Sequence, residues 1–332
     1  MEVDMFGALL ATGKLPHLRS LELVCKVYAS HATADVLPAA VARLTCLTQL
    51  VIDILGAPEQ RFADPVPLLG STLPQLQHLS SIRSLSLARI ADDLDRIEVS
   101  KLTDVYEHMP LLESLELVVW GLGPRTVALG RALRAAGQLT YLKLEFQGED
   151  VVPCVTHADQ LCAELCGLAT LESLVLLLPD DRGSSEPGHS HSENVHEAVD
   201  LPVLSRLSFF SDDDRAPFPD IRKCSKLRQL DGQVTSWVRA MVHRGYKGGV
   251  QKLSLHGDMH GETEGAFVAG LTSITCLELE SFSVYKMEGH GNICRFFGVR
   301  KCQLLDAIEH LRTLKHLRMN QAELDGEDAR DF

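Results

Sequence analysis

The sequence of 332 residues predicts an α/β solenoid, a single domain built from stacked helix–strand units. Two observations predict it. The phrase Leu-x-x-Leu-x-x-Leu-x-Leu recurs about eleven times, with clean copies at Leu15–Leu23 and Leu168–Leu176. The third apolar position of the copies also recurs at steps of 23 to 40 residues, namely at positions 21, 50, 85, 115, 142, 174, 207, 230, 253, 277 and 317. Self-similarity at such a period is typical of a solenoid.

Each copy predicts a helix-to-strand transition. The opening spacing of three suits a turn or the end of a helix, and the closing Leu-x-Leu points both leucines to one face of a short strand. Between the copies, we expect helices at 35–44, 94–109, 125–136, 158–168 and 301–311. One unit alone would expose its apolar face, so neighbouring units must stack, and each buried Leu contributes roughly 1.5–3 kcal/mol.

Two segments interrupt the repeat and are expected to be insertions. Residues 179–200 are polar and rich in Gly, Pro and Ser, so they are expected to form an extruded loop. Residues 282–300 carry Tyr285, Phe296 and Phe297 and are expected to pack against the body. We expect one domain over 1–332 with these two insertions.

Composition limits the partners and the location. The net charge of −13 argues against a nucleic-acid partner, and no stretch approaches about 20 apolar residues, so no membrane partner is expected. The nine cysteines are an odd number without a Cys-x-x-Cys pair, and Cys46, Cys224 and Cys276 fall inside the repeat phrase. We interpret them as reduced core or half-core thiols, which favours a cytoplasmic location, with a nuclear one as the alternative.

Candidate chemistry is sparse. His189, His191 and His196 have a spacing that could hold zinc or nickel, but they fall in the first insertion, and solvated loop histidines are the favoured interpretation. Cys162 and Cys166 share one face of an expected helix, where core thiols are favoured over metal ligands. The sequence contains no nucleophile elbow, and its Gly-rich stretch at 245–249 lacks phosphate-loop spacing. We therefore expect no enzyme, no catalytic residues, no metal and no cofactor.

From Leu15 to Met319 the chain resembles leucine-rich-repeat proteins of the long-repeat, ribonuclease-inhibitor-like class. The resemblance implies a curved horseshoe, with a parallel sheet on the concave face and helices on the convex face. Three residues beyond the closing Leu, the family usually carries a ladder of Asn or Cys residues, and this chain has other residue types at these positions. These positions hold Lys26, Trp120, Gln147, Pro179 and Asp258, a departure that resembles the degenerate repeats of F-box-associated proteins.

Charges alternate along the repeats, with acids after the expected strands and bases before them. The acids are Asp92, Asp93, Asp95, Glu149, Asp150, Asp180, Asp181, Asp212, Asp213 and Asp214, and the bases are Arg131, Arg134, Arg222, Lys223, Lys226, Arg228, Arg312 and Lys315. Compensation of helix macrodipoles accounts for this pattern. An acidic rim that steers a basic partner is the alternative interpretation.

These observations predict a non-catalytic scaffold that binds a protein partner on its concave face or rim. If the acidic rim takes part in binding, it would favour a basic partner. The expected contact residues are Val118, Trp120, Val175, Leu177, Phe210, Glu116, Lys143 and Ser208. A competing expectation is that the helices or the first insertion cover this patch. Two other functions stay open: the substrate-recognition part of an F-box-type ubiquitin ligase, and a structural subunit of a large cytoskeletal or ciliary assembly.

Overall fold

The computed structural model describes part of the chain and divides it into two compact units. The described residues are 15, 17–27, 41, 43–56, 76, 78–88, 99–120, 124–147, 155–177, 201–210, 221–233, 249–256, 262–280 and 308–320. Unit 1 comprises Met1–Ser192 and unit 2 comprises Glu193–Phe332. Both expected insertions, 179–200 and 282–300, lie outside the described residues. Among the described residues, no helix is long and apolar enough to cross a lipid bilayer.

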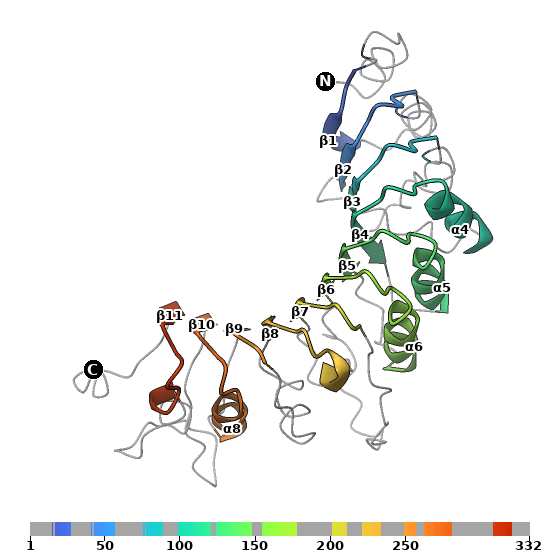
Figure 1. The fold of residues 1–332 in the computed structure, drawn as a ribbon. Helices are drawn as coiled ribbons and strands as arrows, with labels where there is room; N and C mark the ends of the chain where they lie inside the picture. Colours follow the sequence, from blue (N-terminus) through green and yellow to red (C-terminus); the bar gives the residue numbers. More distant parts are fainter. Residues whose placement is uncertain are drawn as a thin grey trace. The chain divides into compact units, whose positions relative to one another are not determined.

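Unit 1 contains a parallel sheet whose strands follow chain order (Figure 1). Its strands are β1 Ser20–Val27, β2 Gln49–Gly56, β3 Ser84–Ala88, β4 Ser114–Trp120, β5 Tyr141–Gln147 and β6 Ser173–Leu177. The third leucines of successive copies stand in register, for example Leu115 beside Leu142 and Leu142 beside Leu174. The third leucines of unit 1 are at most 8 % exposed, so the Leu-x-Leu prediction of strand and core is confirmed here.

Three helices, α4 Val99–Glu107, α5 Pro124–Leu133 and α6 Val155–Leu165, lie on one side of the unit 1 sheet (Figure 1). They overlap the helices expected at 94–109, 125–136 and 158–168. Pro124 begins α5, where its missing N–H costs no hydrogen bond. Gly130 allows α5 and α6 to approach closely, because a Cβ there would lie 2.9 Å from Leu161 Cδ1.

Unit 2 repeats the same plan with five parallel strands in chain order. The strands are β7 Arg206–Phe210, β8 Gln229–Gln233, β9 Lys252–His256, β10 Cys276–Glu280 and β11 His316–Asn320, with the 3-10 turn η4 Ile221–Lys223 before β8. Helix α8, Glu262–Gly270, has no counterpart among the expected helices. Its apolar residues do not follow a helical period and its sequence contains two glycines, although Phe267 and Val268 are buried. The expected helices at 35–44 and 301–311 fall largely outside the described residues.

Hydrogen bonds between repeats hold the stack on the N-terminal side of the strands. The carbonyl oxygen of Arg19 accepts hydrogen bonds from the backbone N–H groups of both Thr48 (2.8 Å) and Gln49 (3.0 Å). The same pair of hydrogen bonds recurs in later repeats, for example from Thr275 and Cys276 to the carbonyl oxygen of Gln251. The Thr48 hydroxyl adds a third bond to Arg19 O at 2.9 Å. Thr140 and Thr275 make the equivalent hydroxyl bonds, to Glu113 O and Gln251 O. Threonines before the strands thus link neighbouring repeats through their side chains.

The cysteines divide by position. The five cysteines whose side chains are described, Cys46, Cys162, Cys166, Cys224 and Cys276, are free thiols. Cys224 is buried and Cys276 is half-buried, but the expectation of a core or half-core position is wrong for Cys46, which is exposed. Cys46 lies in a turn between Leu44 and Leu47, and those two leucines fill the core in its place.

Candidate functional site

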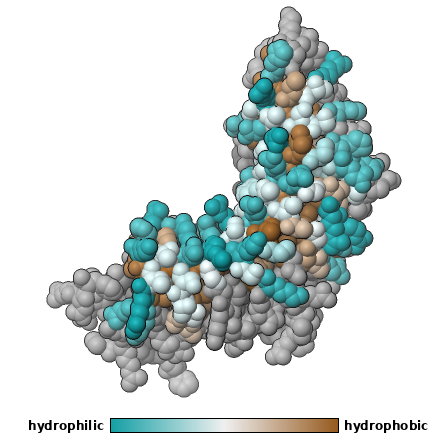
Figure 2. Space-filling view, in the orientation of Figure 1, coloured by the Kyte–Doolittle hydropathy of each residue, from teal (hydrophilic) through white to brown (hydrophobic). Residues whose placement is uncertain are grey.

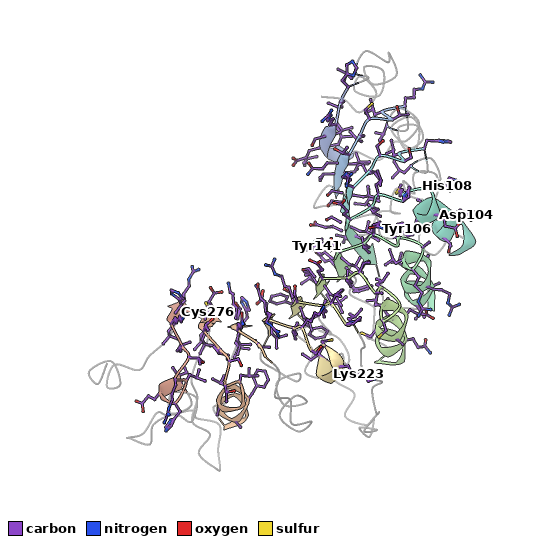
Figure 3. The ribbon with its side chains drawn as sticks, in the orientation of Figure 1. Asp104, Tyr106, His108, Tyr141, Lys223 and Cys276 are labelled. Carbon is purple, nitrogen blue, oxygen red and sulfur yellow. The ribbon has the colours of Figure 1, made fainter. Side chains whose placement is uncertain are left out.

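The candidate site is the side of the unit 1 sheet that faces away from the leucine core. Period-two alternation places two rows of side chains there, in register across β4, β5 and β6. The first row is Glu116, Lys143, Val175 and the second is Val118, Glu145, Leu177. All six are half-buried, as is Tyr141 at the start of β5. We call these seven residues the β4–β6 face. Figure 3 shows Tyr141 beside the strands, whereas Tyr106 points from α4 toward the sheet.

The β4–β6 face has a charged centre and apolar flanks. On β5, Lys143 Nζ lies 3.5 Å from Glu145 Oε2, a pair on adjacent outward positions of one strand. Val118 flanks this pair on β4, and Val175 and Leu177 flank it on β6. A partly exposed ion pair stabilises the fold by only about 0–1 kcal/mol. The pair can therefore exchange part of its contacts for those of a partner at little cost to the fold.

The structure brings five of the eight predicted contact residues together on the β4–β6 face: Glu116, Val118, Lys143, Val175 and Leu177. Trp120 ends β4 in register with Gln147, but its side chain lies outside the described residues. Ser208 and Phe210 lie on β7 in unit 2 and form a separate group. Ser208 is buried, at only 7 % exposed, so it offers little surface to a partner in the free chain.

The equivalent face of unit 2 carries a polar network that the sequence did not reveal. His256 Nε2 on β9 lies 2.9 Å from Asp231 Oδ1 on β8, and the Phe210 ring contacts the His256 ring edge-on with centroids 5.2 Å apart. Burial raises the pKa of Asp231, although the hydrogen bond and the charge of His256 oppose this shift. Their positions on the face follow from the strand pattern. Their contact follows only from the register of the strands.

A second part of this network centres on Glu278 of β10. Lys252 Nζ lies 3.0 Å from Glu278 Oε2, and the Ser254 hydroxyl donates to the same oxygen at 2.8 Å. The hydrogen bond from Lys252 lowers the pKa of Glu278. Lys252, Ser254 and Glu278 thus link β9 to β10 through side chains on the face that points away from the leucine core.

Of the two groups that the sequence offered as possible metal ligands, the structure describes only the cysteine pair. His189, His191 and His196 lie outside the described residues. Cys162 on α6 and Cys166, one residue beyond the end of α6, are both half-buried, and the Cys166 thiol lies 3.2 Å from the carbonyl oxygen of Cys162. Within the described ranges, no group of three or more His, Cys, Asp or Glu side chains could hold a metal ion.

The bases that precede the strands fall into two groups. In unit 1, Arg131 and Arg134 both pair with Glu164 of α6, at 2.9 and 3.0 Å. Arg131 also lies in the last turn of α5, where a cation complements the helix dipole. In unit 2, Lys223 and Lys226 are exposed. Lys223 ends the three-residue turn η4 and Lys226 follows it, and so short a turn has no helix dipole to account for them. The acidic clusters of the predicted rim lie outside the described residues.

No protein-family model and no curated protein matches the chain. Solved structures that resemble it include a TLR13–ssRNA13 complex, with 14 % identity over 86 % of this chain and a TM-score of 0.41. The chain spans 38 % of the TLR13 chain. The leucine-rich repeat domain of APL1B has 13 % identity, covers 97 % of this chain and 74 % of its own, and has a TM-score of 0.38. An internalin, InlF, of Listeria monocytogenes has 13 % identity over 97 % of this chain and 89 % of its own, with a TM-score of 0.32.

The fold assignment rests on the chain itself. Parallel strands follow one another in chain order within each unit, and helices and turns connect them. All of these strands except β8, which has Leu230 and Gly232, carry two apolar residues at the Leu-x-Leu positions. Most leucines of the copies lie in the core, and within each unit backbone hydrogen bonds join each repeat to the next. The chain therefore has the α/β leucine-rich-repeat solenoid fold.

Proposed function

We propose that the chain is a non-catalytic protein-interaction scaffold that binds a protein partner through the β4–β6 face. The observation that carries the proposal is the composition of this face. Val118, Val175 and Leu177 expose part of their apolar side chains around the Lys143–Glu145 pair. Figure 2 shows such apolar and polar groups interleaved on the described surface. Partly exposed apolar side chains that lie together on one face are typical of protein-binding surfaces.

A protein fits this face better than other classes of partner. The apolar flanks offer contact area that a partner's aromatic or aliphatic side chain can bury, at roughly 25 cal/mol per Å². Lys143 and Glu145 offer one charge of each sign, which can orient a partner with complementary charges. The chain's net charge of −13 disfavours a polyanion such as nucleic acid.

We also propose the long-repeat, ribonuclease-inhibitor-like subtype. Helices α4, α5, α6 and α8 between the strands support it, because the shortest leucine-rich repeats leave little room for a full α-helix. Steps such as 30 residues between Leu85 and Leu115 support it as well.

The test uses two substitutions that block the face without straining it. Val175→Glu places a carboxylate in register with Lys143, and Val118→Lys places an ammonium in register with Glu145. Each new charge gains an opposite neighbour, so the fold should tolerate both changes, and the net charge of the double variant is unchanged. Val24→Lys is the matched control. Val24 occupies the row of Val118 on β1, is 57 % exposed and stands in register with Asp53.

Tagged wild-type, double-variant and control chains are used to capture proteins from cell extract, and mass spectrometry quantifies what each retains. The affinity of the main captured protein is then measured with the purified chains. We expect the double variant to bind at least about tenfold more weakly, since an interface residue at the centre of a contact contributes about 1–2 kcal/mol or more. The control should bind like wild type. Equal binding by all three chains, with equal thermal stability, would place the binding surface elsewhere.

A further inference from the structure

The residues that precede the strands carry different charges in the two units. We call the residues between the first and third apolar positions of each copy the N-terminal rim. In unit 1, Glu113 and Glu172 occupy this rim, and Arg83 pairs with Glu113. The described rim of unit 2 comprises 202–206, 225–229, 249–252, 272–276 and 312–316. Among these residues of unit 2 there are several bases and no acid.

Four exposed bases gather where the chain enters β7 and β8. Lys226 and Arg228 precede β8, Lys223 ends the turn η4 just before them (Figure 3), and Arg206 begins the neighbouring strand β7. No described acid forms an ion pair with any of the four. We call these four residues the β7–β8 basic patch. It lies inside unit 2, with described repeats following it along the sheet.

Arg228 is held in place by the backbone of its own turn. Its Nη1 lies 3.3 Å from the carbonyl oxygen of Ser225 and 3.2 Å from that of Leu227. Gly249 of the next repeat leaves room for this guanidinium, because a Cβ there would lie 3.0 Å from Nη1. The opposite edge, with Nε–H and Nη2–H, has no partner among the described residues. Such an edge can bind a carboxylate through two parallel hydrogen bonds.

Arg206 is positioned by the neighbouring repeat. Its Nε donates a hydrogen bond to Gln229 Oε1 at 3.1 Å, and Gln229 stands in register with it on β8. Adjacent strands of a sheet lie about 5 Å apart, so bases on these two repeats can contact one extended segment. Cations whose side chains are already positioned lose less conformational entropy when a partner binds.

We propose that the β7–β8 basic patch docks an acidic segment of a partner protein, with Arg228 binding one carboxylate through two parallel hydrogen bonds. Lys223 and Lys226 attract further acids of the segment as point charges, and Arg206 contacts it from the next repeat. This surface is distinct from the β4–β6 face, and the proposal does not depend on that face.

Two other occupants fit the patch less well. A nucleic acid gains much of its affinity from bases stacked on aromatic rings, and the described rim of unit 2 contains no Phe, Tyr or Trp. The net charge of −13 also repels a long polyanion, and it repels a second copy of this chain. A short acidic segment brings its few charges directly to the bases and meets less of this repulsion.

The probe is a fluorescein-labelled peptide of about eight residues in which Glu and Ser alternate, long enough to cross neighbouring repeats. Fluorescence anisotropy measures its binding to the full chain. Lys226→Gln/Arg228→Gln removes two bases of the patch. Arg312→Gln/Lys315→Gln removes two exposed rim bases from another copy, with the same change in net charge, and is the matched control. We expect about tenfold weaker binding by the patch variant, from lost charge-assisted hydrogen bonds, and less than about a twofold change in the control.

Two further variants test the geometry of the patch. Arg228→Lys keeps the charge but cannot form two parallel hydrogen bonds, so it should still weaken binding about threefold or more. Lys223→Gln/Lys226→Gln changes only exposed side chains and leaves Arg228 intact, and it should weaken binding more than the control does. Thermal unfolding followed by circular dichroism checks that every variant is folded.

Four results would overturn the proposal. They are wild-type affinity in Arg228→Lys, equal weakening in the patch variant and the control, equal binding of a peptide with Gln in place of Glu, and a single-stranded oligonucleotide that binds as tightly as the Glu-Ser peptide. Sedimentation velocity tests the remaining occupant, because self-association of wild type that the patch variant loses would assign the patch to a second copy of this chain instead.

Discussion

Two equivalent leucines of unit 2 should respond differently to the same substitution. Leu277 and Leu317 stand in register on adjacent strands, but they are 0 % and 46 % exposed. Truncation of a fully buried Leu to Ala destabilises a protein by about 2–5 kcal/mol, through lost transfer free energy and a residual cavity. At Leu317 roughly half of the side chain already contacts solvent, so Leu317→Ala should cost about 1–2.5 kcal/mol by the same scale.

Urea unfolding followed by circular dichroism measures both variants beside wild type, with the free energy of unfolding taken from the transition of unit 2. The difference between the variants is the informative quantity, because the removed atoms and the strand position are the same. Equal destabilisation by the two substitutions would refute the reasoning, since it would mean that Leu317 is as fully packed as Leu277.

Four further predictions concern Tyr106, the cysteines and the segment 179–200. Tyr106 is fully buried and its hydroxyl has no hydrogen-bond partner among the described residues, so Tyr106→Phe should stabilise unit 1 by about 1 kcal/mol, seen as a rise of about 2–4 °C in the melting temperature. Burial raises the pKa of Tyr106 above the ordinary 10.0, so above pH 10.0 this tyrosine ionises only in the unfolded chain. Wild type should therefore lose stability as the pH rises above 10.0, whereas Tyr106→Phe should not show this loss. A parallel loss of stability in both chains would contradict the prediction. Iodoacetamide should alkylate exposed Cys46 well before Cys224, which is 3 % exposed, and peptide mass spectrometry after timed quenching would reveal the opposite order. Deletion of 179–200 should leave the melting temperature within a few degrees of wild type because this segment is polar, and collapse of the fold would refute this prediction. If wild type binds zinc measurably and the deletion does not, His189, His191 and His196 form a metal site after all.

The sequence was sufficient for the strands because one local rule governs them. A Leu-x-Leu pair can bury both side chains only in an extended segment, and leucines such as Leu142 and Leu253 are 0 % exposed in the structure. Helix α8 could not be predicted in the same way, since its apolar residues are not arranged at a helical period. Burial of Phe267 and Val268 provides the stabilisation that its own pattern does not encode.

The sequence predicted which residues lie on the outward face of the strands, but not which side chains bury or contact them. The outward positions of β4–β6 follow from alternation, and the structure confirms the register of Val118, Lys143 and Val175 with their neighbours. The burial of Ser208 and the contact between Asp231 and His256 depend on side chains from other repeats. Neighbouring repeats are separated by 23 residues or more, so no local pattern encodes these contacts.

Hydroxyl-radical footprinting of the chain with and without its captured partner tests the proposed binding face most directly. Side chains of the β4–β6 face that react readily with radicals, above all Tyr141 and Leu177, are half-buried in the free chain and should be oxidised at a measurable rate. We expect the partner to slow oxidation of Tyr141 and Leu177 while Val24 on β1 stays unchanged. Unchanged oxidation of Tyr141 and Leu177 in a saturated complex would contradict the assignment of this face as the binding surface.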